Sequence, residues 1–224
     1  MFIADFPAGP LAANCYVVAS AAGGRCVIVD PGQDAVDRVA GLVAEHGLTV
    51  DAVLLTHGHF DHVWSAASLC ETYAVPAYLH PADRALLTDP GRGLDPGLAA
   101  QLLDLFKGQV PGEPSDLVAV ADTQVVRLAG LEFTVDHAPG HTPGSVTYTV
   151  PGTGDAPAVM FTGDLLFAGS IGRSDFPGGD HAEILRSLDR VCLSRDDDTA
   201  VLPGHGPRTT IGQERATNPF LRDL

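Results

Sequence analysis

Basic residues are scarce in this sequence. Its 224 residues include 13 lysines and arginines against 28 aspartates and glutamates, which gives a formal net charge of −15 at pH 7. An acidic surface repels phosphate backbones and anionic lipid headgroups. The composition therefore predicts that neither nucleic acid nor a membrane surface is a partner of this protein.

Long apolar segments, export signals and paired cysteines are also lacking. No apolar run approaches membrane-spanning length, and the start, MFIADF, has no basic segment followed by a long apolar core. The four cysteines form no Cys-x-x-Cys pair, so we expect reduced, mostly buried thiols in a cytoplasmic protein. The chain has no Gly-x-Ser-x-Gly elbow and no placed Cys–His pair, which removes the usual side-chain nucleophiles.

What the sequence does contain is an alternation of strand and helix patterns. Apolar content of 45% with 18% charged residues is typical of a globular chain. Strands are predicted over 13–20, 25–30, 52–55, 77–79, 124–128, 131–137, 145–150, 157–162 and 200–202, and helices near 33–46, 63–73 and 181–193. This order predicts an α/β fold with two groups of strands separated near residues 107–117. No linker is long enough to divide the chain, so we expect one domain over residues 1–224.

The most informative segment is Thr56-His57-Gly58-His59-Phe60-Asp61-His62. It lies between an apolar strand pattern and the start of a helical pattern, where side chains can converge on one point. Neutral imidazole and carboxylate are the ligands that a zinc-like divalent cation accepts. The alternative is a surface turn in which Asp61 caps the helix and the histidines are solvated. Three crowded imidazoles favour the metal site.

Three later segments share the layout of a strand that ends in a glycine-rich turn. These turns carry His141, Asp164 and His205, and their glycines allow the backbone to approach closely. Asp30, in the turn Asp30-Pro31-Gly32, either caps the next helix or supports a metal ligand, and the sequence favours the structural role. The other histidines are predicted to be structural, with His137 as a possible support of the His141 loop; they are His46, His80, His137 and His181.

The spaced pattern His-x-His-x-Asp-His, followed by a His, an Asp and a His, resembles the metallo-β-lactamase fold superfamily. The segment Gly-His-Thr-Pro-Gly-Ser around His141 and Thr162-Gly163-Asp164 are similar to the glyoxalase II branch, and the C-terminal region is similar to its short bacterial members, the hydroxyacylglutathione hydrolase-like proteins. The resemblance covers essentially the whole chain. It implies an αββα sandwich of two mixed β-sheets with helices on the outer faces.

The resemblance also implies a set of ligands for two metal ions, most simply Zn²⁺, with iron or manganese as alternatives. One metal would take His57, His59 and His141, and the other Asp61, His62 and His205. Asp164 would bridge both, and Asp61 is in addition the candidate catalytic residue. Two cations held this way activate a shared water as the nucleophile.

Hydrolysis of a thioester is the reaction that this resemblance implies, with S-lactoylglutathione as the substrate type. Two departures bear on the substrate. Residues 1–224 include no C-terminal helical glutathione-binding domain, and the segment after Asp164 carries Arg173 as the candidate substrate-binding residue with Asp175 in place of an aromatic. Arg173 either binds a substrate carboxylate or is held by Asp175.

Two other functions remain as alternatives. The pattern Gly-Arg-x-Asp-Phe also resembles persulfide dioxygenases, which use a single iron at the site matching His57, His141 and Asp164. A metal-stabilised binding module without catalysis is the more distant alternative. Metal content separates the thioester hydrolase from the persulfide dioxygenase, since two zinc-like ions favour hydrolysis and one iron favours oxidation. The thiol carrier, the acyl group, the native metal and the oligomeric state are left open by the sequence.

Overall fold

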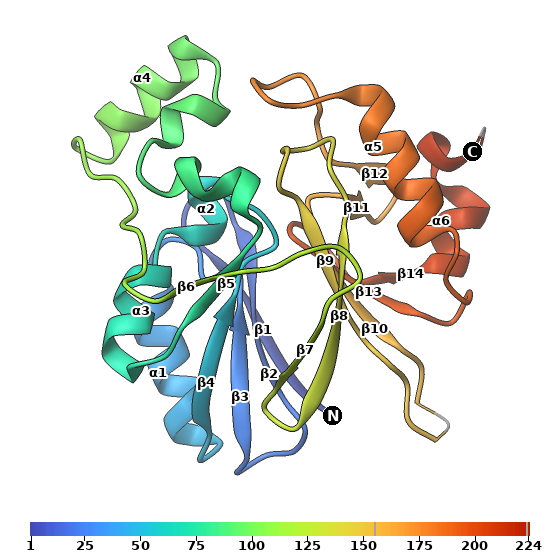
Figure 1. Ribbon diagram of the computed structural model, residues 1–224, viewed down its shortest axis with the longest axis horizontal. Helices are drawn as coiled ribbons and strands as arrows, with labels where there is room; N and C mark the ends of the chain where they lie inside the picture. Colours follow the sequence, from blue (N-terminus) through green and yellow to red (C-terminus); the bar gives the residue numbers. More distant parts are fainter. Residues whose placement is uncertain (155, 223) are drawn as a thin grey trace.

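The first half of the chain forms a six-stranded sheet. In the computed structural model, which describes residues 1–154, 156–222 and 224, its strands follow one another in chain order (Figure 1). They are β1 (Phe2–Ala8), β2 (Ala13–Ala19), β3 (Arg25–Val29), β4 (Thr49–Leu54), β5 (Ala77–Leu79) and β6 (Leu117–Ala119). Strands β1 to β3 pair antiparallel, whereas β3 to β6 pair parallel. The carboxyl ends of β3, β4 and β5 therefore lie at one edge of the sheet.

The second half forms another six-stranded sheet, in the order β14-β13-β10-β9-β8-β7. Its strands are β7 (Val125–Leu128), β8 (Leu131–His137), β9 (Val146–Val150), β10 (Val159–Gly163), β13 (Ala200–Pro203) and β14 (Thr209–Thr210). Only β10 and β13 pair parallel, so their carboxyl ends share an edge, and the β8–β9 loop lies at that edge too. A hairpin of β11 (Leu166–Phe167) and β12 (Ser170–Ile171) follows β10 there.

Helices lie on the outer sides of both sheets (Figure 1). Beside the first sheet are α1 (Ala35–Glu45), α2 (Phe60–Val63), α3 (Ala66–Tyr73) and α4 (Pro96–Leu105), with the short turns η1 (Pro81–Leu87) and η2 (Pro90–Gly93). Beside the second are α5 (His181–Ser187), η3 (Leu188–Cys192), α6 (Ile211–Thr217) and η4 (Pro219–Leu221). The two sheets face each other between these layers, which confirms the predicted αββα sandwich.

Strand β2 shows how one sequence serves two apolar layers. Its side chains alternate across the sheet, as they must in a strand. Cys15 and Val17 pack with the helices on the outer face, while Tyr16 and Val18 pack between the sheets. The Tyr16 ring meets that of Phe161 from the second sheet edge-on, with centroids 5.3 Å apart. Each buried side chain of this size contributes about 1.5–3 kcal/mol, so the sandwich holds its site-bearing edges firmly.

Most predicted elements are present, with small shifts of their ends, but the structure also differs from the sequence-based expectation. Strand β1 and the short strands β6, β11, β12 and β14 were not predicted. The expected helix over 63–73 is divided, because the backbone N–H and hydroxyl of Ser65 donate to Pro31 and Gly32 at 2.9 and 2.7 Å. All four cysteines are buried free thiols, as predicted. Among the described residues, no helix is long and apolar enough to cross a membrane.

Candidate metal centre

Four of the seven predicted ligands follow strand β4. Between Leu55 and His59 the chain is not helical, and His59 is the extended residue at which α2 begins. Residues two apart in such a segment point to the same side. The rings of His57 and His59 accordingly lie 4.9 Å apart, while Asp61 and His62 project from the first turn of α2.

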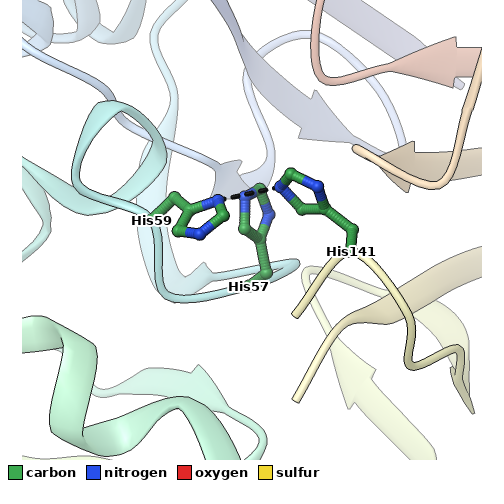
Figure 2. A group of neighbouring side chains, drawn as sticks. All are labelled: His57, His59 and His141. Atoms are coloured by element: carbon green, nitrogen blue, oxygen red, sulfur yellow. Dashed lines mark hydrogen bonds between the residues drawn. The ribbon is translucent and has the colours of Figure 1, made fainter. Parts of the chain in front are cut away.

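The other three predicted ligands come from the second sheet. His141 lies in the β8–β9 loop, Asp164 follows β10, and His205 follows β13. Figure 2 shows His57 and His59 on one loop and His141 on the facing loop, with the three rings directed toward one another. The Nδ1 atom of His59 lies 2.8 Å from Nε2 of His141. The site therefore forms only where the edges of both sheets meet.

These side chains form two neighbouring groups. The ring nitrogens of His57, His59 and His141 lie within 4.8 Å of one another, and so do the ligand atoms of Asp61, His62 and His205. Asp164 lies between the groups. Its Oδ2 is 3.6 Å from Nε2 of both His141 and His205, and its Oδ1 is 3.4 Å from Nε2 of His62. All seven residues singled out in the sequence are thus brought together.

The donor atoms fit divalent cations. Among the described residues, the buried atoms His57 Nε2 and Asp164 Oδ1 have no hydrogen-bond partner, although buried polar groups are normally paired. The Nδ1 atom of His141 donates to the carbonyl oxygen of Arg173 at 2.7 Å. Its Nε2 atom is therefore unprotonated, and the lone pair of this atom faces His59. A neutral imidazole fixed through its other nitrogen is the usual form of a histidine that binds a metal.

Burial keeps the first group neutral. Burial lowers the pKa of His59 to about 3 and that of His141 to about 4, and it lowers the pKa of His57 well below its usual value. An unprotonated imidazole is the state that ligates a cation. The first group is therefore a set of three lone-pair donors at neutral pH.

Three carboxylates, Asp30, Asp61 and Asp164, surround His62 of the second group. Burial opposes charge on His62, but the three carboxylates around it outweigh this effect and raise its pKa to about 10. Burial likewise opposes charge on Asp61, yet the neighbouring histidines hold its pKa well below the usual range. A field that binds a proton this firmly at His62 also attracts a divalent cation, since both respond to the same negative charge.

Asp30 supports this centre, and the preference for a purely structural turn role was wrong. Helix α1 is preceded by Asp34, not Asp30. The buried carboxylate of Asp30 accepts from the N–H and hydroxyl of Thr56 at 2.8 and 2.6 Å and meets Nδ1 of His62 at 3.1 Å. Because β3 and β4 are parallel neighbours, Asp30 follows one strand beside the loop that follows the other. It therefore fixes the orientation of the His62 ring.

Glycines pack directly against Asp164, as the glycine-rich turns predicted. A Cβ atom at Gly204 would lie 2.2 Å from Asp164 Oδ1 and 2.8 Å from His62 Cε1. One at Gly172 would lie 1.7 Å from the Asp164 carbonyl oxygen. Neither position has room for a methyl group. Gly204 lets the β13 end approach the Asp164 carboxylate, and Gly172 lets the segment after β12 approach the Asp164 backbone.

A cavity of about 470 Å³ opens beside the centre. His59, Asp61, His141, Asp164 and His205 form its base. Its walls are mostly apolar and come from both halves of the chain, and they are formed by Leu11, Phe60, Leu94, Leu98, Phe167, Ile171 and Phe176, with Ser170 and Arg173. The site thus combines a polar base with apolar walls, as small-molecule sites usually do.

Arg173 reaches this cavity but is already paired. Its Nε and Nη2 donate to the two carboxylate oxygens of Asp175 at 2.8 Å each, and its guanidinium lies 3.5 Å from the centre of the Phe176 ring. Of the two roles considered for Arg173, the contact with Asp175 is the one present here. Its carbonyl oxygen meanwhile orients His141.

The remaining histidines lie outside the two groups, in structural positions. His137 Nε2 contacts the carbonyl oxygen of Pro143 at 2.9 Å, so it does support the His141 loop. His80 stacks on His137 with ring centroids 4.1 Å apart, His46 packs against Phe2, and His181 contacts Ser174. A buried carboxylate that sequence reasoning missed, Asp83, contacts both ligand loops. No local signal distinguishes it from an exposed helix acid.

Residues 8–205 match the family model described as the metallo-beta-lactamase superfamily. The chain belongs to this superfamily. The match includes all seven residues of the two groups. The chain is thus a member of a metallo-hydrolase family, and the centre described above is its candidate metal site.

Individual relatives agree with this assignment. The hydroxyacylglutathione hydrolase GloC of Haemophilus influenzae is 36% identical over 203 residues, covering 88% of this chain and 87% of that protein. The crystal structure of the B3 metallo-beta-lactamase BLEG-1 superposes with a TM-score of 0.83 at 36% identity, covering 99% of this chain and all of that one. The structure of TTHA1623 in a di-iron-bound form superposes with a TM-score of 0.77 at 38% identity, with the same coverage.

Proposed function

We propose that this superfamily member is a binuclear metal-dependent hydrolase of thioesters between a small acyl group and a thiol carrier, of the hydroxyacylglutathione type. The observation that carries the proposal is the position of Asp164, whose two oxygens face histidines of both groups. The similarity to a hydroxyacylglutathione hydrolase over most of the chain supports the substrate class.

We assign the seven candidate ligands to two cations of the zinc type. His57, His59 and His141 would hold one, Asp61, His62 and His205 the other, and Asp164 would contact both. Cations bound there supply an activated water and polarise the substrate carbonyl. Asp61 also lines the cavity, so its carboxylate is placed to accept a hydrogen bond from the attacking water and orient it. We assign it this second role.

The cavity suits such a substrate. Its apolar walls exclude water from the acyl group and its base presents the metal-binding side chains. A thiolate is a good leaving group, since its conjugate acid has a pKa of about 8.5. The site therefore needs no strong general acid.

A second candidate is oxidation of a thiol-bound persulfide at a single iron. The similarity to a structure solved with two irons supports iron as a possible metal, although not a single-iron site. Against it, the group of Asp61, His62 and His205 is complete and lies beside the first. A single iron held by His57, His141 and Asp164 would leave these three side chains without a metal, so hydrolysis is the better supported function.

The test is a panel of acyl-thiol conjugates assayed with purified protein, together with metal analysis and oxygen uptake on the same sample. Two equivalents of metal with thioester cleavage support the proposal, whereas one iron with oxygen uptake selects the alternative. A cephalosporin in the panel tests for lactam cleavage. We expect His59→Ala to abolish cleavage and to release metal while the sandwich remains folded by circular dichroism. Full activity of that variant would contradict the ligand assignment.

A further inference from the structure

One carboxylate outside the seven candidate ligands contacts both loops of the first group. Asp83 lies in η1, immediately beyond β5, and is fully buried. Its Oδ2 accepts from the backbone N–H of Gly58 at 2.8 Å and from the hydroxyl of Thr142 at 2.6 Å. Its Oδ1 accepts from the backbone N–H of Gly144 at 2.7 Å.

These partners are the immediate neighbours of the candidate ligands. Gly58 stands between His57 and His59 on the loop that follows β4 of the first sheet. Thr142 follows His141 on the β8–β9 loop of the second sheet. The Asp83 carboxylate therefore joins two loops that belong to different sheets, at the place where each presents its imidazoles.

The packing around Asp83 is as close as its hydrogen bonds indicate. A Cβ atom at Gly144 would lie 2.6 Å from Asp83 Cγ and Oδ1, and one at Gly58 would lie 2.8 Å from the Asp83 carbonyl oxygen. Both loops thus approach Asp83 at a glycine, where no side chain intervenes. Glycine is required at these two positions because of this contact, since neither has a positive φ.

A buried carboxylate at this position has a cost. All three hydrogen-bond donors are neutral, and burial of a carboxylate without a cation costs several kcal/mol even when hydrogen bonds offset part of it. An apolar residue would avoid that cost but would leave the three donors unpaired, at about 1–3 kcal/mol each. What the carboxylate adds is the ability to accept from several directions at once.

His59 depends most on this support. His57 contacts Thr56 through its ring, and His141 donates to the carbonyl oxygen of Arg173. The second ring nitrogen of His59, by contrast, has no partner among the described residues. The place of its ring relative to His141 is therefore set by the loop backbone, which Asp83 fixes through Gly58.

We infer that Asp83 is a positioning residue: it sets the separation between the His57–His59 loop and the His141 loop, and thereby the affinity of the first group for a divalent cation. The inference rests on the ligand assignment of the proposed function. It adds to that assignment a residue that touches no cation and acts through two peptide groups and one hydroxyl.

The experiment measures cation binding, separately from activity. His205→Ala serves as the parent, so that the first group is the complete one, and Co²⁺ binding is followed by its visible absorption. Asp83→Asn keeps the volume of the side chain but turns an NH₂ group toward donors that need an acceptor. We expect it to weaken Co²⁺ binding by about 10–100-fold, the usual effect of losing such support, and to change the absorption spectrum.

Three further variants make the result decisive. Thr142→Val removes one of the three hydrogen bonds and should weaken binding, whereas Thr142→Ser should restore it; this pair decides the question if Asp83→Asn does not fold. Asp136→Asn removes a buried carboxylate that pairs with Arg195 away from the centre, and should lower stability without changing affinity.

Unchanged Co²⁺ affinity in Asp83→Asn, or an equal loss in Asp136→Asn, would overturn the inference and leave the proposed function standing. Failure of the wild-type chain to bind any cation would overturn both.

Discussion

Replacement of Asp30 by asparagine tests how the second group is oriented. Asp30 accepts three hydrogen bonds, two from Thr56 and one from Nδ1 of His62. Its φ of 49° lies in the left-handed region, which asparagine tolerates well. Asp30→Asn therefore removes the negative charge and one acceptor without straining the backbone.

The expected effect follows from the ring of His62. The asparagine NH₂ group cannot accept from Nδ1, so the ring must lose that bond or accept instead, with its proton moved to Nε2. Nε2 is the atom that faces Asp61 and Asp164, at 3.6 and 3.4 Å, and a protonated nitrogen cannot ligate. The hydroxyl of Thr56 can rotate to accept from the new amide. The free energy of unfolding should therefore fall by about 1–3 kcal/mol, which is the cost of one buried donor or acceptor left unpaired.

Native mass spectrometry at limiting Zn²⁺ measures the result. We expect Asp30→Asn to bind its second cation about 10–100-fold more weakly than wild type, while the first cation is retained. Asp34→Asn is a matched control, because Asp34 also has a positive φ and is acidic, but lies at the start of α1. If Asp30→Asn loads two cations like the wild-type chain, the orientation of His62 by Asp30 is refuted.

Other perturbations have equally specific outcomes. Removal of metal by a chelator should lower the melting temperature and should not unfold the sandwich, as followed by circular dichroism. Asn218→Ala leaves the carbonyl of Ser170 unpaired, so KM should rise several-fold with kcat nearly unchanged, because the β11–β12 hairpin lines the cavity. The hydrogen bond with Arg25 holds the pKa of Asp51 below its usual value, so Asp51 stabilises the fold above about pH 4 and loses this effect as pH falls. Asp51→Asn should lower the free energy of unfolding by up to about 1 kcal/mol at pH 7, and the deficit in urea titrations should shrink below about pH 4; an equal deficit at every pH would contradict this sign.

The positions of the candidate ligands were accessible from sequence because each depends on local structure. His57 and His59 stand at the end of an apolar strand, and a glycine-rich turn follows each of the other strands that carry a ligand. Strand periodicity and turn chemistry are short-range properties. That the loops meet at one edge followed from resemblance to a family, and the parallel pairing of β3 with β4 and of β10 with β13 provides the physical reason.

The features that sequence reasoning missed depend on tertiary contacts. Asp83 is 25 residues from Gly58 and 59 from Thr142, and no spacing rule connects them. The break between α2 and α3 arises because Ser65 bonds to the β3–α1 turn, which overrides a continuous helical pattern. Strand β1 was missed because only two of its seven residues are buried, so its apolar periodicity is weak.

The close contacts around Asp164 also bear on how this scaffold can be altered. Libraries that vary Leu94 or Leu98 change the cavity wall and keep all seven candidate ligands. Substitutions at Gly172 and Gly204 have no such freedom, because any side chain there meets Asp164 at 1.7 to 2.2 Å. Directed evolution toward new substrates should therefore recover clones with diverse walls and with glycine retained at both positions.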